Sequence, residues 1–186
     1  MGSCAPSPAL ALSRHEYDRT MPDAAALPSI SPERLREVAG AFVTGVTIVT
    51  TSAEDGLFGC TANAVASLSL EPPLMLVCLD RAANTHPRML AARTFAINII
   101  RAGEENVELC RSFAAKADDK FAGVPHRLGA AGAPLLEAAL ATLECELERT
   151  YEGGDHTIFI GRVVDAAVGE GEPLIFHRGR FSGLGD

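Results

Sequence analysis

Four neutral hydrogen-bonding side chains lie close together in the mostly apolar segment 59–78: Thr61, Asn63, Ser67 and Ser69. A polar group that is buried without a partner is costly, so each of them needs a hydrogen-bonding partner. Either the backbone or a bound molecule can supply it. Ser67 and Ser69 are equally explained as ordinary strand hydroxyls, so the residues alone leave both explanations open.

A second polar pair, Asn84 and Thr85, lies where a strand is expected to end and a helix to begin near His86. The first turn of a helix has unpaired N–H groups and the positive end of the helix dipole, and both attract anions. Either residue also suits a plain helix N-cap. The pair therefore indicates a candidate anion site, with simple capping as the alternative.

The elements that would position these side chains are mostly strands. The β-branched segment 46–52 and the segment 57–63 flank a turn at residues 54–56, which predicts a hairpin. Further strands are predicted over residues 65–70, 74–80, 94–100, 141–151 and 156–168, with one short final strand within residues 174–181. Short helices are predicted from the N-cap Ser31, over residues 86–93 and over residues 103–114.

Strands and helices do not alternate regularly, so the pattern favours a mainly β fold, an antiparallel barrel with short peripheral helices, over a doubly wound sheet. Within the strand at 141–151, Leu143, Cys145 and Leu147 alternate with Glu144 and Glu146. This alternation predicts one buried face and one solvent-facing face.

The composition and charge limit the classes of protein. Residues 1–30 are rich in Ala, Pro and Ser and predict a flexible N-terminal arm, followed by one folded domain over residues 31–186. The formal net charge of −8 disfavours nucleic acid as a partner. The chain has neither the long apolar run of a membrane span nor a signal-peptide pattern, so we expect no membrane contact and a cytoplasmic protein.

The cysteines and histidines predict no metal site. The five cysteines are odd in number, widely spaced and without a C-x-x-C pair, which is typical of small core thiols in a reducing compartment. The five histidines also lack ligand spacing. Signatures of a P-loop, a Rossmann dinucleotide site and a hydrolase nucleophile elbow are all missing from the sequence.

Six segments in order resemble the flavin reductase family, the small components of two-component flavin-dependent monooxygenases. They are TGVTIVTT, GCTANAVASLSLEPPL, NTHPRML, FAINII, GDHTIFIGRV and FHRGRF, and the match as a whole covers roughly residues 32–181. The resemblance implies a split antiparallel β-barrel of the FMN-binding type, normally a homodimer. It implies FAD or FMN as the flavin and NADH or NADPH as the electron donor, and leaves both choices open.

The resemblance also implies a set of flavin contacts. It places Thr61, Ala62, Asn63 and Ala64 along the isoalloxazine edge, with Ser67, Leu68 and Ser69 near the ribityl chain and phosphate. It makes Asn84 and Thr85 a second contact on the phosphate side. It places Thr47 and Ile48 where the first strand meets the flavin, and Ser112 and Phe113 near the adenine end of FAD.

His156 follows a Gly-Gly-Asp turn and is explained without the family as a polar residue at a hairpin turn. The resemblance instead implies that Asp155 and His156 lie beside the nicotinamide, with His156 as the catalytic residue and Phe181 shielding the ring. Hydride transfer between the two rings depends on stacking and distance more than on acid–base help, so the expected role of His156 is positioning.

The function that the resemblance implies is NAD(P)H-dependent reduction of a flavin that then leaves for a separate oxygenase. Three alternatives stay open: a carrier that keeps its flavin tightly bound, a flavin-binding module without turnover, and an enzyme similar to pyridoxamine-phosphate oxidases.

Overall fold

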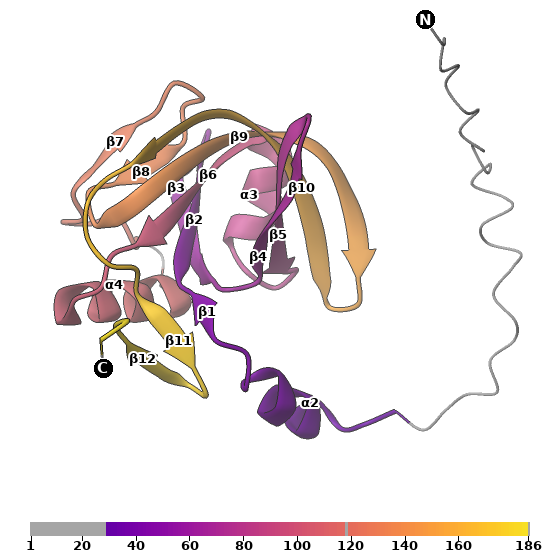
Figure 1. Ribbon diagram of the computed structural model, residues 1–186. Coiled ribbons are helices and arrows are strands. Elements are labelled where there is room, and N and C mark those ends of the chain that lie inside the picture. The colour runs from indigo at the N-terminus through magenta and orange to yellow at the C-terminus, as the bar shows by residue number, and fades with distance from the viewer. Residues whose placement is uncertain (1–28, 118, 186) are drawn as a thin grey trace, which may run out of the picture. The chain divides into compact units, whose positions relative to one another are not determined.

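The computed structural model describes residues 29–117 and 119–185 of the chain (Figure 1). The chain divides into two units, residues 1–36 and 37–186. Most of the arm predicted over residues 1–30 lies outside the described residues. Helix α2 (Pro32–Ala39) has the predicted start, because the backbone N–H of Arg34 donates to Ser31 Oγ at 3.2 Å.

The second unit is built on a seven-stranded antiparallel sheet with the order β3-β2-β6-β9-β10-β5-β4. The strands are β2 (Thr47–Ala53), β3 (Gly56–Ala62), β4 (Val65–Leu70), β5 (Pro73–Asp80), β6 (Thr94–Ile100), β9 (Ala139–Gly153) and β10 (His156–Val168). The prediction of a mainly β, antiparallel fold is confirmed. The hydrogen-bonded ladder is open, with β3 and β4 as its two edges.

Five short strands accompany this sheet. They are β1 (Thr44–Gly45), β7 (His126–Leu128), β8 (Pro134–Leu136), β11 (Ile175–His177) and β12 (Arg180–Ser182). The prediction of a single strand within residues 174–181 was wrong, since β11 and β12 form a hairpin. Arg178 and Gly179 between them have φ angles of +48° and +78°, the backbone conformation that a two-residue hairpin turn requires.

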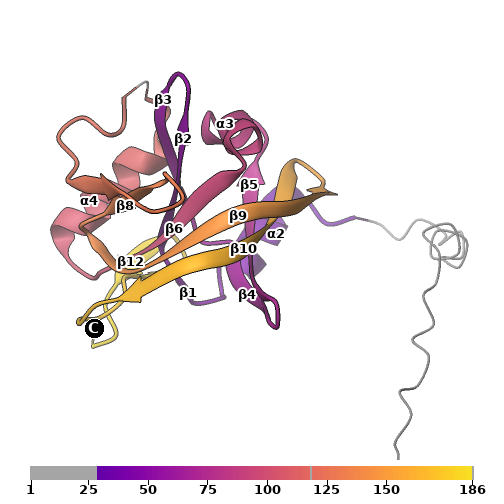
Figure 2. The ribbon, with the colours of Figure 1, turned by 90° about the horizontal axis from the view of Figure 1, so that it is seen from above.

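Strand β2 separates two hydrophobic clusters because its side chains alternate between the faces of the sheet. Val49 packs with Phe95 and Phe159 in one cluster, which Met89 of helix α3 (Thr85–Ala92) completes. Ile48 packs on the other face with Phe113 of helix α4 (Glu104–Ala114). Figure 2 shows α3 between the β2–β3 hairpin and β5, and α4 on the other side of that hairpin.

The prediction that Glu144 faces solvent was wrong. Its side chain is 2% exposed, and its carboxylate accepts hydrogen bonds from the backbone N–H groups of Ala130 (3.1 Å) and Ala131 (2.7 Å). The loop at residues 129–133 covers this face of β9, and its N–H groups need an acceptor there. Gly129 lies so close that an added Cβ would come within 2.2 Å of the carboxylate.

The described residues contain neither a membrane-spanning helix nor a metal-binding cluster. No helix within residues 29–117 and 119–185 is both long enough and apolar enough to cross a bilayer. Over the same ranges, no three His, Cys, Asp or Glu side chains gather closely enough to hold a metal ion.

We expect Glu144→Gln to lower the free energy of unfolding by about 1–3 kcal/mol, because an amide NH₂ cannot accept and one buried N–H would lose its partner. Urea unfolding monitored by circular dichroism measures this loss. Glu146→Gln is the matched control: Glu146 lies on the same strand but forms only an exposed ion pair with Arg162. It should cost at most about 1 kcal/mol, and equal losses would contradict the buried role of Glu144.

Candidate active site

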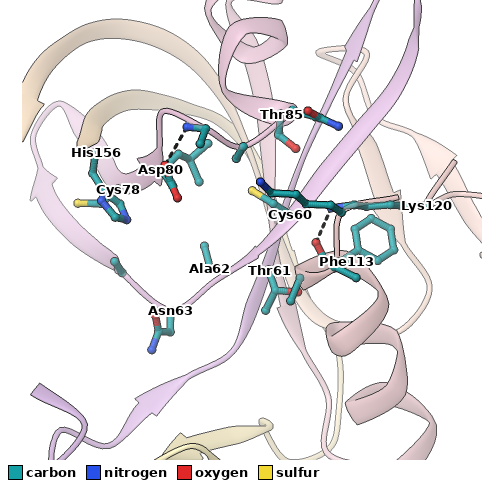
Figure 3. A pocket seen from close by; sticks show the side chains of 18 residues that line it. Cys60, Thr61, Ala62, Asn63, Cys78, Asp80, Thr85, Phe113, Lys120 and His156 are labelled. Carbon is teal, nitrogen blue, oxygen red and sulfur yellow. Dashed lines mark hydrogen bonds between the residues drawn. The ribbon is translucent and has the colours of Figure 1, made fainter. Parts of the chain in front are cut away.

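One cavity of about 310 Å³ lies where the ends of β3 and β5, the start of α3, the end of α4 and the start of β10 meet (Figure 3). This volume is at the lower end of the range for small-molecule sites, about 300–1,000 Å³. The lining residues are Cys60, Thr61, Ala62, Asn63, Ala64, Cys78, Leu79, Asp80, Ala82, Ala83, Asn84, Thr85, Phe113, Ala114, Ala115, Lys116, Lys120 and His156.

The wall formed by the end of β3 is held by two hydroxyl groups. Thr47 Oγ1 donates to the carbonyl of Ala62 at 2.6 Å, and Thr61 Oγ1 donates to the carbonyl of Cys110 in α4 at 2.6 Å. The chain then turns at Asn63 and pairs with β5, where the N–H of Cys78 donates to the carbonyl of Ala64 at 2.9 Å. The backbone of residues 61–64 is therefore fixed along the cavity.

The opposite wall contains His156, which pairs with Asp80 in the β5–β10 ladder. Its Nδ1 lies 2.7 Å from Oδ1 of Asp155, and this hydrogen bond lowers the pKa of Asp155. A carboxylate only accepts, so Nδ1 carries the proton. In the neutral imidazole, Nε2 is then the nitrogen with a free lone pair.

A second histidine lies behind this wall. His86 Nε2 is 2.9 Å from Thr157 Oγ1, and the His86 ring meets Phe159 edge-on at 5.4 Å between centroids. Burial, followed by the charge of Arg81, lowers the pKa of His86. The neutral imidazole is thus favoured, and it ties the start of α3 to the residue that follows His156.

The structure brings many of the predicted site residues together on this cavity. Those that line it are Thr61, Ala62, Asn63, Ala64, Asn84, Thr85, Phe113 and His156. Asn84 makes no side-chain capping hydrogen bond to α3, so the capping alternative does not account for its amide. Asp155 is exposed and reaches the site through His156.

Thr47 and Ser67 line a different cavity of about 400 Å³, together with Met75, Ile97 and Ile99. Asn63 lines both cavities, so the two adjoin at this residue. The hydroxyl of Thr47 is already engaged with the carbonyl of Ala62.

The remaining predicted residues line neither cavity. Ile48 is fully buried against α4, and Leu68 and Ser69 lie on the edge strand β4, where Leu68 is 47% exposed. Ser112 Oγ donates to the carbonyl of Leu109 within α4. Phe181 packs against Phe176 with ring centroids 5.2 Å apart.

Sequence reasoning missed five lining residues with reactive or ionisable side chains: Cys60, Cys78, Asp80, Lys116 and Lys120. The cysteines were predicted to be core thiols, and burial does raise the pKa of both Cys60 and Cys78. The lysines carried one available signal, because the sequence contains no others. Lys116 follows the predicted Phe113 by only three residues, but the sequence does not show that the chain after α4 passes along this cavity.

Comparison with known proteins identifies the family. Residues 39–185 match the model of the flavin reductase like domain. The chain belongs to this family, and the resemblance found in the sequence is confirmed.

Named relatives in this family are similar over most of their length. The reductase subunit HsaB of a flavin-dependent monooxygenase from Rhodococcus jostii is 37% identical over 87% of this chain and 82% of its own. The reductase component of a 4-nitrophenol 4-monooxygenase/4-nitrocatechol 2-monooxygenase from Rhodococcus opacus is 44% identical over 83% of this chain and 82% of its own.

A solved structure extends the comparison. The NADH:FAD oxidoreductase of Streptomyces globisporus C-1027, in complex with NAD and FAD fragments, aligns with a TM-score of 0.76 and 43% identity. The alignment covers 84% of this chain and 96% of that one. The residues of the cavity suit a flavin, because exposed amides at Asn63 and Asn84 match the polar edge of the ring and two ammonium groups match a phosphate.

We expect FAD to slow the alkylation of Cys78 by iodoacetamide several-fold, because Cys78 lines the cavity. Peptide mass spectrometry measures the rate for each thiol. Cys110 and Cys145 are internal controls: both are buried, which raises the pKa of each to about 12, so they should stay unmodified with or without FAD. Equal rates at Cys78 with and without FAD would place the flavin elsewhere.

Proposed function

We propose that this chain oxidises NADH, reduces FAD as a dissociating substrate and supplies the reduced flavin to a separate oxygenase. The observation that carries this proposal is one cavity lined by the 61–64 stretch, by Asn84 and Thr85, and by His156. Relatives named as reductase components of monooxygenases, and an NADH:FAD oxidoreductase solved with NAD and FAD fragments, support it.

In this proposal the flavin ring lies against the fixed backbone of residues 61–64, and the exposed amide of Asn63 contacts its polar edge. Thr61 acts indirectly, because its hydroxyl already donates to Cys110 and holds the strand in place. Ser67 reaches the flavin from the adjoining cavity through the shared residue Asn63. Ile48, Leu68, Ser69, Ser112 and Phe181 are assigned no direct contact.

Hydride transfer is chemistry that nicotinamide and flavin supply when bound, so the chain's contribution is orientation and the exclusion of water. His156 is the residue best placed to orient the nicotinamide. Asp155 holds its proton on Nδ1, which leaves Nε2 to accept a hydrogen bond from the carboxamide NH₂ of the nicotinamide.

We also propose a split β-barrel, a homodimer and a cytoplasmic location. Ala62 of β3 and Val77 and Leu79 of β5 share one core cluster, which supports a sheet curled into a split barrel. Leu70 and Val168 are 85% and 83% exposed, and such apolar side chains suit an interface in a homodimer. A cytoplasmic location, where NADH is available, completes the proposal.

We expect NADH oxidation, followed at 340 nm, to require added FAD and to saturate with it. His156→Ala should lower kcat/KM for NADH about tenfold or more, the effect of losing one good hydrogen bond, while the FAD dissociation constant changes by less than about threefold. His177→Ala is the matched control, since His177 does not line the cavity.

Equal loss of NADH oxidation and FAD affinity in His156→Ala would contradict the nicotinamide role. FAD binding without any NADH oxidation by the unaltered chain would overturn the proposed function and favour a carrier or a binding module.

A further inference from the structure

The only two lysines of the sequence, Lys116 and Lys120, line the same cavity. The remaining basic residues are all arginines, and no arginine lines the cavity. The chain as a whole has a net charge of −8, which repels phosphates at long range. The cavity is therefore a local exception, with two ammonium groups and one carboxylate, that of Asp80, on its walls.

Lys120 is held by neutral partners. Its Nζ donates to the carbonyl of Phe113 at 2.7 Å and to that of Gly59 at 3.3 Å, and burial lowers its pKa. An ammonium group has three N–H donors, so one donor is left after these two bonds. The carbonyls orient the group at the junction of β3 and α4 without neutralising its charge.

Carboxylates do not compensate these cations within the described residues, where no ion pair involves Lys116 or Lys120. Asp119 is adjacent to Lys120 in sequence, but its Oδ1 accepts from the N–H groups of Phe121 (3.0 Å) and Ala122 (3.1 Å). Asp80 accepts from the N–H of Ala82 and lies with His156 on the opposite side of the cavity from Lys120 (Figure 3).

We infer that Lys116 and Lys120 bind a phosphate or pyrophosphate group of a nucleotide whose ring lies toward Asn63 and His156. The inference rests on the proposed function and gives the bound nucleotide a direction in the cavity. Lysine suits a ligand that must leave, because it meets a phosphate as a single point charge, whereas arginine forms a bidentate fork.

The decisive comparison is between FMN and riboflavin, which share the ring and differ by the phosphate. We expect Lys120→Met to raise the FMN dissociation constant about tenfold or more, the effect of losing a charge-assisted hydrogen bond, and to change that of riboflavin by less than about twofold. Quenching of flavin fluorescence measures both constants. Lys120→Arg should retain part of the preference for FMN.

Arg127→Met is the control for net charge, because it removes one positive charge from an exposed position outside the cavity. It should leave both constants unchanged. A merely structural role for Lys120, in holding the end of α4 to β3, would weaken FMN and riboflavin equally, and that result would overturn the inference for the flavin phosphate.

A second arm identifies the source of the phosphate, because NADH also carries a pyrophosphate. With riboflavin as acceptor, kcat/KM for NADH is compared with that for reduced nicotinamide riboside, which has no phosphate. A loss in Lys120→Met that is confined to NADH assigns the lysine to the nicotinamide nucleotide, and a loss confined to FMN binding assigns it to the flavin. If neither arm shows a selective loss, the inference is overturned.

The two proposals fail separately. If the unaltered chain does not oxidise NADH with any flavin, the proposed function fails, and the binding comparison between FMN and riboflavin still tests the lysines.

Discussion

The end of strand β3 is held from both sides, and the cavity depends on this constraint. Thr47 on β2 donates to the carbonyl of Ala62, and the hydroxyl of Thr61 reaches across to the carbonyl of Cys110 in α4. The first bond is buried and the second is partly buried, and leaving such a group without a partner away from water is costly. The strand therefore cannot shift toward β2 or α4 without losing one of them, and the wall that begins at Cys60 has a fixed position.

The rest of the site follows from that wall. The chain leaves β3 at Asn63, and the bond from the N–H of Cys78 to the carbonyl of Ala64 brings β5 alongside. Strand β5 pairs with β10 so that Asp80 faces His156, and α3 starts a few residues beyond Asp80. On the opposite side of the cavity, Lys120 donates to the carbonyls of Gly59 and Phe113 and so joins β3 to α4. Groups distant in sequence thus surround one space that is neutral near Asn63 and cationic near Lys120.

The sequence predicted the features that local rules control. The hairpin of β2 and β3, the boundaries of β6 and β10, and the N-cap at Ser31 all follow from alternation, turn residues and capping chemistry. Glu144 was misplaced because alternation says which residues share a face but not that a loop covers it. The β11–β12 turn was missed because Arg178 adopts a positive φ, which is uncommon for a residue other than glycine.

The sequence predicted those cavity-lining residues that belong to contiguous segments. Short segments that resemble the family contain residues 61–64, Asn84, Thr85 and His156. The positions of Cys78 and Lys120 on the cavity depend instead on strand order and on the path of the chain after α4. Ile48 was predicted from its place in the matching segment alone. Side chains alternate between the two faces of a strand, and that of Ile48 lies on the face of β2 that packs against α4.

The central claim is that flavin is a substrate that leaves. Anaerobic ultrafiltration tests it most directly: the chain is mixed with a large excess of NADH and FAD, and reduced FAD in the filtrate is measured by its absorbance. The account predicts many moles of reduced FAD in the filtrate per mole of chain. Reduction that stops at about one flavin per chain, with that flavin retained by the membrane, would contradict it.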